Sequence, residues 1–526
     1  MTGITGTETK FKNAFTLAAP MSTTAVALMN PPSVESVARA LRFGSRPAIR
    51  DASGTISYAD LAGGSLRAGT RLRGGRPDLA GARVAFLIPP GRDFVFAEWG
   101  TWLAGGIAVP LCLTHPRTEM EYVISDSDAS ILIAHPEFAE IAGQIAAAKG
   151  LRLISTTELC SAPAEAGPVV AQSHPAVIIY TSGTTGKPKG VVLTHGNLVA
   201  QITCLVQAWG WVAEDHILHV LPLHHVHGLI NVLACALWSG ALCEMQPRFE
   251  AKAAWQCFLR GELTLFMAVP LIYKRLIAAW EENDPAAREA MTQACRKLRL
   301  MVCGSAALPE PTFFRWQEIS GQPLLERYGM SEIGMALSNP LHGERRPGMV
   351  GQPLPGIKVR LVDESGQPVG EGQNGEIEVR GSGVFSEYWR RPKESKDAFR
   401  AGWFRTGDIA IVNGGVYRIL GRNSVDIIKT GAYKVSALEI EQELLSHPAI
   451  EECAVVGVPD DEWGERVCAA IKWKNGEGVS IEALRTWCKQ RLAVYKIPRT
   501  LHSTSDLPRN AMGKVTKKAV QAMFMA

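Results

Sequence analysis

The sequence predicts an α/β protein with two parts, a large layered domain followed by a small α+β domain. Three observations support this prediction. The chain has 526 residues, which is long for one domain. Up to about residue 170, apolar runs typical of strands alternate with helical patterns, as in a sheet covered by helices. From about Gly356, apolar and polar residues alternate between Gly-rich turns, which indicates antiparallel strands.

The elements of the first part follow in order along the chain. Residues 82–91 predict a buried strand that ends in a loop, and residues 93–111 predict a helix followed by another strand. Residues 174–180 predict a short apolar strand that leads into a Gly/Thr-rich loop, and residues 191–209 predict a strand followed by a helix. The loop therefore lies at a strand end, where ligands commonly bind in α/β proteins.

The second part of the chain contains the predicted domain boundary. We place this boundary near residues 421–424, so that residues 31–422 form the large domain and residues 423–526 the small one. In the small domain, residues 450–460 predict a strand and residues 480–492 an amphipathic helix.

Composition and charge limit the kinds of function to consider. The hydrophobic fraction of 46% and the charged fraction of 20% are ordinary for a globular protein. A net charge of +4 argues against nucleic-acid binding, which usually needs a concentrated basic surface. The longest apolar run, residues 228–243, is shorter than the roughly 20 residues that span a bilayer, and predicts a buried helix. We therefore expect small-molecule substrates, and neither a nucleic acid nor a membrane as partner.

Cysteine usage and the N-terminus bear on the cellular location. The eleven cysteines are scattered without a C-x-x-C pair, which predicts reduced thiols and a cytoplasmic protein. Residues 1–30 are rich in Thr and Ala, contain Glu8 and lack arginine, whereas organelle transit peptides are usually Arg-rich and poor in acidic residues. We interpret residues 1–30 as a loose leader, and a mitochondrial matrix location is the weaker alternative.

The stretch YTSGTTGKPKG, Tyr180–Gly190, predicts a phosphate-binding loop. Its glycines allow close approach of the backbone to an anion. It differs from the nucleotide-binding P-loop, because Lys187 is followed by Pro188 and not by Ser or Thr. Hydroxyl groups and cations come from Ser182, Thr184, Thr185, Lys187 and Lys189. These hydroxyl groups and cations suit a diphosphate that leaves as pyrophosphate. A surface turn that is only by chance rich in Gly and Thr would not need so many of them over so long a stretch.

Five motifs in a fixed order resemble those of the adenylate-forming superfamily, which includes the acyl-CoA synthetases. They are the loop above, RYGMSE (327–332), WFRTGD (403–408), GRNSVDIIKTGAYKVSALEIE (421–441) and PRNAMGK (508–514). The resemblance implies a large domain with a barrel-like β subdomain and a mobile small domain. It also implies a two-step reaction, in which a carboxylate attacks the α-phosphate of ATP and a thiol, usually of coenzyme A, then displaces AMP.

The resemblance implies roles for individual residues. Lys514 would reach the α-phosphate and the attacking carboxylate, and Glu332 would hold Mg²⁺ together with Thr184. Tyr328 would stack on adenine, and Asp408 would bind the ribose hydroxyls. The remaining residues implied to contact ATP or coenzyme A are Thr181, Ser182, Gly183, Thr185, Lys187, Lys189, Gly304, Ser305, Ala306, Arg327, Gly329, Met330, Ser331, Arg422, Lys429 and Gly431.

The acid is indicated by LPLHHVHGL (221–229) and RLMVCGSAALP (299–309), which closely resemble the malonyl-CoA synthetase branch. Malonate keeps a second carboxylate that needs a cationic partner when buried. Arg299 starts a predicted buried strand and is our candidate for that partner. The resemblance further implies that His225, Val226 and Met330 border the acyl group, with His225 as a catalytic candidate.

Several alternatives remain open at this point. The acid could be methylmalonate, another short-chain or dicarboxylic acid, and the thiol could belong to a carrier protein. A nucleotide-binding module without catalysis is disfavoured, because Lys514, Glu332 and Asp408 are all present. Two departures from the family pattern, Ala432 in the implied pantetheine tunnel and Ser424 at the implied hinge, leave the coenzyme A step less defined.

Overall fold

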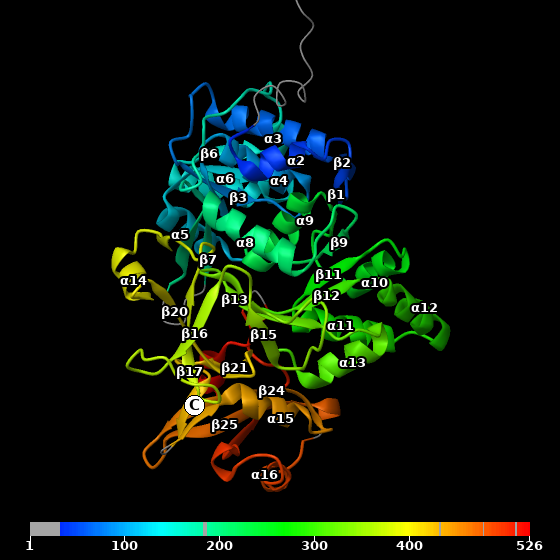
Figure 1. The fold of residues 1–526 in the computed structure, drawn as a ribbon, viewed down its shortest axis with the longest axis vertical. Helices are drawn as coiled ribbons and strands as arrows, with labels where there is room; N and C mark the ends of the chain where they lie inside the picture. The colour runs from blue at the N-terminus through cyan, green and yellow to red at the C-terminus, as the bar shows by residue number, and fades with distance from the viewer. Residues whose placement is uncertain (1–31, 182–186, 431–432, 477, 511–512, 526) are drawn as a thin grey trace, which may run out of the picture.

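The computed structural model describes residues 32–181, 187–430, 433–476, 478–510 and 513–525 (Figure 1). The predicted leader, residues 1–30, lies outside the described residues. Two sheets with their helices make up the larger part of the chain, and a third sheet lies below them in Figure 1. This arrangement confirms the predicted α/β layers with a small C-terminal α+β unit.

The first sheet has seven strands, and its helices cover both faces. β4, β3, β5, β6 and β7 pair in parallel, whereas β8 and β18 are antiparallel additions. In sheet order the strands are β18 (Glu387–Tyr388), β8 (Lys189–Thr194), β7 (Pro175–Thr181), β4 (Ile107–Pro110), β3 (Arg83–Leu87), β5 (Ala129–Ala134) and β6 (Arg152–Ser155). The accompanying helices are α3 (Tyr58–Arg73), α4 (Arg92–Leu103), α5 (Arg117–Ser127), η1 (Pro136–Phe138), α6 (Ala139–Lys149) and α7 (Thr156–Leu159).

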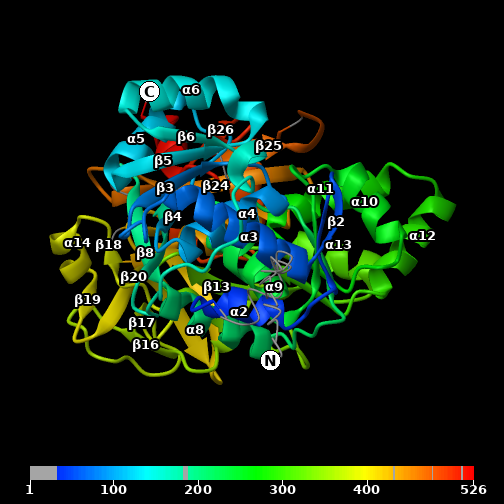
Figure 2. The same cartoon turned by 90° about the horizontal axis from the view of Figure 1, so that it is seen from above.

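The alternation of side chains along β3 explains the two covered faces. Val84 and Phe86 belong to the core cluster shared with α3 and α4, whereas Ala85 and Leu87 belong to the cluster shared with α5 and α6. Because successive strand residues point to opposite faces, both sets must be apolar. Figure 2, seen from above, shows α5 and α6 on one side of this sheet and α3 and α4 on the other.

The second sheet has fourteen strands and is parallel at one end. β1, β10, β9, β11, β12 and β13 pair in parallel, and the pairs from β13–β14 onward are antiparallel. In sheet order the strands are β16 (Lys358–Val362), β17 (Gly375–Arg380), β20 (Trp403–Asn413), β21 (Val416–Arg422), β15 (Met349–Pro353), β14 (Gly334–Ser338), β13 (Leu325–Met330), β12 (Leu300–Cys303), β11 (Leu265–Ala268), β9 (His216–His219), β10 (Leu242–Met245), β1 (Pro47–Asp51) and β2 (Gly54–Ser57), and β19 (Phe399–Arg400) pairs with β20. The β subdomain predicted as barrel-like is the antiparallel end of this sheet.

The helices that accompany this part of the chain connect its parallel strands or lie between its segments. They are α2 (Glu35–Leu41), α8 (His195–Ala208), the π-helix η2 (His227–Ala234), α9 (Cys235–Ser239), α10 (Ala251–Leu259), α11 (Pro270–Glu281), α12 (Pro285–Arg296), α13 (Glu310–Ser320) and α14 (Pro392–Asp397). The apolar run 228–243 is buried as predicted, in η2 and α9. Within the described residues, we find no helix with the length and apolar character that crossing a membrane requires.

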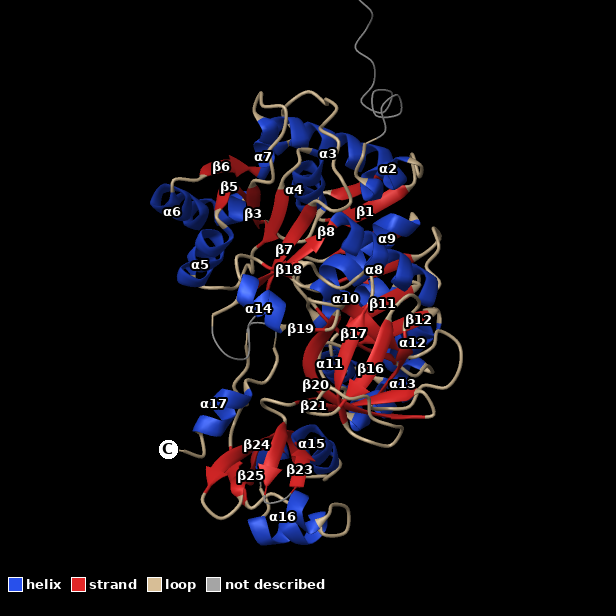
Figure 3. Cartoon of the chain, turned by 60° about the vertical axis from the view of Figure 1, so that its left-hand side comes forward, coloured by secondary structure: helices blue, strands red, loops and turns tan. Residues whose placement is uncertain are grey.

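The third sheet forms the small C-terminal unit, which Figure 3 shows apart from the larger sheets. Its strands are β22 (Ile427–Thr430), β23 (Tyr433–Ser436), β24 (Ile450–Asp460), β25 (Gly464–Trp473) and β26 (Thr500–Ser503). Its helices are α15 (Ala437–Leu445), η3 (Lys474–Gly476), α16 (Ile481–Cys488), η4 (Val494–Lys496) and α17 (Lys517–Ala522). The unit has apolar clusters of its own, one on each face of the sheet.

Candidate active site

The carboxyl ends of three parallel strands bring many of the predicted residues to one edge of the large sheet. His225 and Val226 follow β9, residues 304–306 follow β12, and residues 327–330 lie in β13. Ligands of α/β proteins commonly bind outside this edge. Segments that are about eighty to a hundred residues apart in the chain are therefore neighbours, because parallel pairing aligns their carboxyl ends.

Asp408 connects three of the predicted motifs. It lies opposite Arg422 in the β20–β21 pair, and the Arg422 Nε donates to Asp408 Oδ1 at 3.0 Å. The Tyr328 hydroxyl donates to Asp408 Oδ2 at 2.6 Å. The Asp408 carboxylate is thereby held in one orientation at the edge of a buried site.

Glu332 lies one residue beyond the buried Ser331, just after β13. Its Oε1 accepts a hydrogen bond from the Tyr388 hydroxyl at 2.9 Å. Burial raises the pKa of Glu332 above its usual value. The Tyr388 ring also faces Lys189, whose Nζ lies 5.2 Å from the ring centroid. Tyr388 was not selected from the sequence, and it joins the predicted metal ligand to the phosphate loop.

The phosphate loop is described only at its two ends. Thr181 ends β7 and pairs with Lys189 of β8, whereas Ser182, Gly183, Thr184 and Thr185 lie outside the described residues, as does Gly431. Lys187 Nζ lies 5.4 Å from the centroid of the Tyr122 ring. Both loop lysines therefore face tyrosine rings from other segments.

The histidines after β9 form a compact cluster. The His224 and His225 rings lie 4.0 Å apart, and burial lowers the pKa of His225 to about 4, so its imidazole is neutral at pH 7. His227 Nδ1 lies 3.2 Å from the Ser305 hydroxyl. Ser305 has φ 72°, a strained conformation for a residue other than glycine and one that clusters at functional sites.

His115 adds a contribution from the other sheet, and sequence reasoning missed it. Its ring lies 6.4 Å from that of His224, and its Nδ1 lies 3.3 Å from Glu119 Oε2. In the sequence, only the position of His115 could have indicated it as a site residue, since it follows the carboxyl end of the parallel strand β4. The two sheets therefore both contribute to the wall beside the histidines.

The buried guanidinium of Arg327 indicates what kind of ligand the site can hold. The residue is 4% exposed, and its guanidinium lies so close to Gly304 that a Cβ there would come within 2.6 Å of Arg327 Cζ. Its Nη2 donates weakly to the Ser305 hydroxyl at 3.4 Å, and its Nε has no partner. Burial lowers the pKa of Arg327 to about 10. Among the described residues no carboxylate pairs with it, so the site holds a buried cation without an anion.

Arg299 does not lie at this site, which corrects our prediction for it. It precedes β12, at the amino end of the strand, whereas Gly304 follows the carboxyl end about 16 Å away at the usual rise per residue. Its Nε and Nη2 donate to Asp215 Oδ1 and Oδ2 at 2.8 and 2.6 Å, and its Nη1 donates to the Trp209 carbonyl. The Asp215 side chain is 1% exposed. Arg299 therefore neutralises a buried carboxylate of the fold.

Lys514 approaches the same edge from the small domain. It lies in a tight turn in which the Lys514 backbone N–H donates to Asn510 Oδ1 at 3.0 Å. Gly513 lies against Leu271, near the start of α11, and α11 follows the carboxyl end of β11. Lys274 holds the small domain by ion pairs with Glu452 at 2.7 Å and Glu451 at 3.3 Å.

Lys429, the other predicted residue of the small domain, lies on the exposed face of β22. It pairs with Lys434 of β23 across the hairpin. Within the described parts of the chain, its side chain forms no hydrogen bond or ion pair with another predicted residue.

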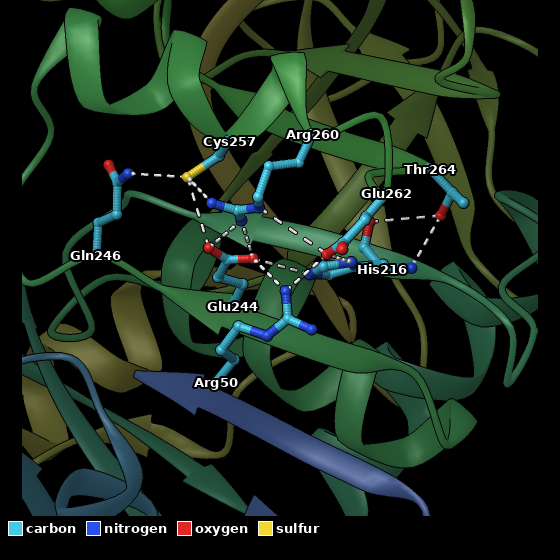
Figure 4. A network of polar contacts seen from close by, with 8 residues as sticks. All are labelled: Arg50, His216, Glu244, Gln246, Cys257, Arg260, Glu262 and Thr264. Carbon is cyan, nitrogen blue, oxygen red and sulfur yellow. Dashed lines mark hydrogen bonds and ion pairs between the residues drawn. The ribbon is translucent and has the colours of Figure 1, made fainter. Parts of the chain in front are cut away.

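A second polar cluster lies where β1, β9 and β10 meet, and Figure 4 shows it. His216, Glu244 and Glu262 have the spacing of a metal site. However, Arg260 donates to both Glu244 oxygens at 2.5 and 2.6 Å, and Arg50 donates to Glu262 at 2.7 Å. The carboxylates already have cationic partners, so we interpret the cluster as an ion-pair network that holds β1 against β10.

Comparison with known proteins gives consistent matches over nearly the whole chain. The family model "AMP-binding enzyme" matches residues 37–389, and "AMP-binding enzyme C-terminal domain" matches residues 439–514. The chain is 45% identical over 528 residues to the mitochondrial malonate–CoA ligase ACSF3 of Homo sapiens, covering 92% of this chain and 91% of that protein.

Solved structures give the same result. ATP-bound MatB from Rhodopseudomonas palustris is 33% identical, with a TM-score of 0.84 and coverage of 92% of this chain and 98% of that one. The o-succinylbenzoate coenzyme A synthetase of Bacillus subtilis, in complex with ATP and a magnesium ion, is 27% identical with a TM-score of 0.79 and coverage of 92% and 98%.

Proposed function

The chain belongs to the AMP-binding enzyme family, and we propose that it joins malonate to coenzyme A through an acyl-adenylate. In the first step a malonate carboxylate attacks the α-phosphate of ATP, and pyrophosphate leaves. In the second step the thiol of coenzyme A attacks the acyl carbon, and AMP leaves. The enzyme is an AMP-forming acid–thiol ligase.

The buried guanidinium of Arg327 is the observation that carries the choice of acid. Burying a charge without a partner costs several kcal/mol, so its retention beside Gly304 implies an anionic ligand. The unreacted carboxylate of malonate supplies that anion, and a planar guanidinium binds a carboxylate with two parallel hydrogen bonds. A monocarboxylic acid would leave Arg327 buried and unpaired. We therefore replace Arg299 by Arg327 as the proposed anchor.

The other side chains are assigned to the parts of ATP and the acyl group. Asp408, fixed by Arg422, accepts hydrogen bonds from the ribose hydroxyls, and Tyr328 lies beside the adenine. Lys514 stabilises the charge that develops at the α-phosphate. His225 borders the reacting carboxylate, and its neutral ring adds no charge there. Val226 and Met330 form the apolar wall beside the malonate methylene.

The remaining residues are assigned to the terminal phosphates of ATP and to the thiol of coenzyme A. Lys187 and Lys189 bind the pyrophosphate half of ATP, and Lys429 is assigned to the path of the thiol. The division of the chain at residues 422 and 423 belongs to the same proposal, since it lets the small domain move between the two steps.

A magnesium ion is compatible with the residues at the phosphate end. Mg²⁺ is usually held by one or two carboxylates together with substrate phosphates and waters. Glu332 offers a carboxylate beside the phosphate loop, and its hydrogen bond from Tyr388 fixes the orientation. The ion would offset the negative charge of the phosphates.

The direct test is the identity of the products. Purified protein incubated with malonate, ATP, Mg²⁺ and coenzyme A is expected to give malonyl-CoA, AMP and pyrophosphate in equal amounts. Methylmalonate, acetate, butyrate and oxalate define the range of acids, and an acyl carrier protein in place of coenzyme A tests the alternative acceptor. Formation of ADP and phosphate would contradict the proposed mechanism.

The location in the cell is a separate question. The cysteine pattern favours a cytoplasmic protein, whereas the human relative is mitochondrial by its name. Imaging the full chain fused at its C-terminus to a fluorescent protein distinguishes the two.

A further inference from the structure

Helix α5 contacts Lys187 and Pro188 of the phosphate loop through the side chain of Tyr122. The Tyr122 hydroxyl donates a hydrogen bond to the Pro188 carbonyl at 2.8 Å. The ring of the same tyrosine lies beneath Lys187, whose Nζ is 5.4 Å from the centroid. This distance is within the range of a cation–π interaction. One residue outside the loop therefore holds both the backbone and the charge of two consecutive loop residues.

Tyr122 is itself held in place by a polar network. Its ring packs edge-on against Tyr180 at 6.5 Å, and the Tyr180 hydroxyl donates to Asp126 Oδ2 at 2.8 Å. Asp126 Oδ1 accepts from Arg391 Nη2 at 2.6 Å. Burial, with the Asp126 carboxylate, raises the pKa of Tyr122, which keeps the hydroxyl protonated as a donor. The network joins α5 to β7 on one side of the loop and to the segment before α14 on the other.

The type of contact has a chemical consequence for Lys187. An ion pair with a carboxylate would neutralise the ammonium group and occupy its donors. An aromatic face attracts the cation without accepting its N–H groups as a carboxylate would, so all three donors stay available to phosphate oxygens. Among the described residues Lys187 forms no ion pair, and the same holds for Lys189 above Tyr388.

We propose that Tyr122 is a positioning residue for adenylation, which holds Lys187 where it binds the pyrophosphate half of ATP. The proposal rests on the proposed function only in taking MgATP as the ligand, and does not depend on which acid is activated. Tyr122 acts through Lys187 and Pro188, and contributes to the step in which pyrophosphate leaves. It has no part in the later attack of the thiol.

The test separates the hydroxyl from the ring. Tyr122→Phe keeps the ring beneath Lys187 and is expected to weaken MgATP binding about two- to ten-fold, through the lost hydrogen bond. Tyr122→Leu removes both contacts and is expected to weaken it about ten-fold or more. Calorimetry gives the MgATP affinity, and pyrophosphate exchange gives the adenylation rate. Thioester formation from pre-made malonyl-adenylate should stay within about two-fold of the wild type.

Two controls decide whether Tyr122 acts through the lysine. Phe138 packs against the same apolar cluster and, within the described residues, forms no hydrogen bond or cation–π contact with the loop, so Phe138→Leu matches the loss of packing and should leave MgATP binding unchanged. In a double-mutant cycle, Tyr122→Leu should weaken MgATP binding less in the Lys187→Met background than in the wild type, because the cation–π contact is already lost and only the hydrogen bond to Pro188 remains to be removed.

The possible results of these experiments distinguish the positioning role of Tyr122 from the proposed function. If the effects of Tyr122→Leu and Lys187→Met multiply, or if Tyr122→Leu binds MgATP like the wild type, the proposal is wrong. If Tyr122→Leu does not fold, Tyr122→Phe decides, because MgATP binding as tight as that of the wild type would contradict the proposal. A protein that binds MgATP but does not activate malonate would contradict the proposed function and leave this inference standing.

Discussion

Arg327 and Arg299 lie near the same pair of strands and have opposite surroundings. Arg299 is paired with Asp215 at two oxygens, so its charge is already balanced. Arg327 has a hydroxyl and a histidine nearby and no carboxylate partner among the described residues. A bound anion would give Arg327 the ionic partner that it lacks. At Arg299 the anion would have to compete with Asp215. Specificity for a diacid is therefore expected to depend on Arg327.

The first residue-scale prediction is a change in substrate ratio. Arg327→Ala leaves the second malonate carboxylate without a partner, which typically costs about 3–5 kcal/mol, or roughly 10²- to 10³-fold in kcat/KM. Butyrate has no second charge and should lose much less. Arg327→Lys should restore malonate only in part, because an ammonium lacks the planar fork. The measurement is kcat/KM for both acids in each variant.

Arg299→Ala is the matched control for this experiment. It leaves the buried Asp215 without its cation, which typically costs about 1–3 kcal/mol of stability, and should lower the melting temperature. The malonate-to-butyrate ratio should stay at the wild-type value. If Arg327→Ala also keeps that ratio, the anchor lies elsewhere. Arg248, which follows the carboxyl end of β10 without an ion pair among the described residues, is then the next residue to test.

At the scale of elements, local signals predicted where strands and helices lie. β24 spans the predicted residues 450–460, and α16 begins after Ser480, whose side chain accepts from the Ala483 N–H as a cap. The apolar run 228–243 is buried as predicted but is not one regular helix, because it begins in a π-helix, its helical part ends before Gly240, which has φ 82°, and its last two residues belong to β10. π-Helical turns frequently occur at functional sites, and this one begins at His227 beside the Ser305 hydroxyl.

Helix α4 carries an element-scale prediction about pH. It is buried on almost all sides, and Glu98 within it is 3% exposed with Oε1 unpaired. Burial raises its pKa to about 8 from an ordinary value of 4.5. Between these values the unfolded chain ionises Glu98 while the folded chain keeps the proton. Stability is therefore lost as pH rises, by about 1.4 kcal/mol for each pH unit.

Glu98→Gln removes this penalty, and its benefit should grow with pH. The variant should melt at a higher temperature than the wild type at pH 8, with a smaller difference at pH 5.5. Glu137→Gln, at an exposed position on η1, is the control for a general effect of charge. A difference in melting temperature that does not change with pH would show that Glu98 ionises normally.

At the scale of the whole molecule, the small domain is docked with Lys514 near the site. Gly513 touches Leu271, Lys274 pairs with Glu451 and Glu452, and Gln442 Nε2 donates to the Leu308 carbonyl at 3.1 Å. Leu308 lies just beyond the loop that carries Ser305. These contacts place the Lys514 turn beside α11, which follows the carboxyl end of β11 in the large sheet.

The prediction at this scale is that a substitution of Lys514 affects adenylation and not thioester formation. Lys514→Ala should lose most of the adenylation activity, because the charge that develops at the α-phosphate loses its cation. Thioester formation from pre-made malonyl-adenylate should be nearly unchanged, if the small domain moves the lysine away before that step. Pyrophosphate exchange and thioester formation are measured separately. An equal loss in both would contradict a division of labour between the two domain positions.

The sequence by itself determined the family, the order of the motifs and most of the elements. The phosphate loop, Asp408, Glu332 and Lys514 were identified because their motifs are short and contiguous, and strands such as β24 because burial imposes a local apolar pattern. The fold was needed to show that Arg299 is paired with Asp215 while Arg327 has no carboxylate partner among the described residues, and that Tyr122, Tyr388 and His115 lie beside the predicted residues. Those facts depend on which end of a strand a residue occupies, and on contacts between segments far apart in the chain. A local pattern carries no information about either, because Arg299 precedes one buried strand and Arg327 lies in the next, and what distinguishes them is the set of groups that the fold places beside them.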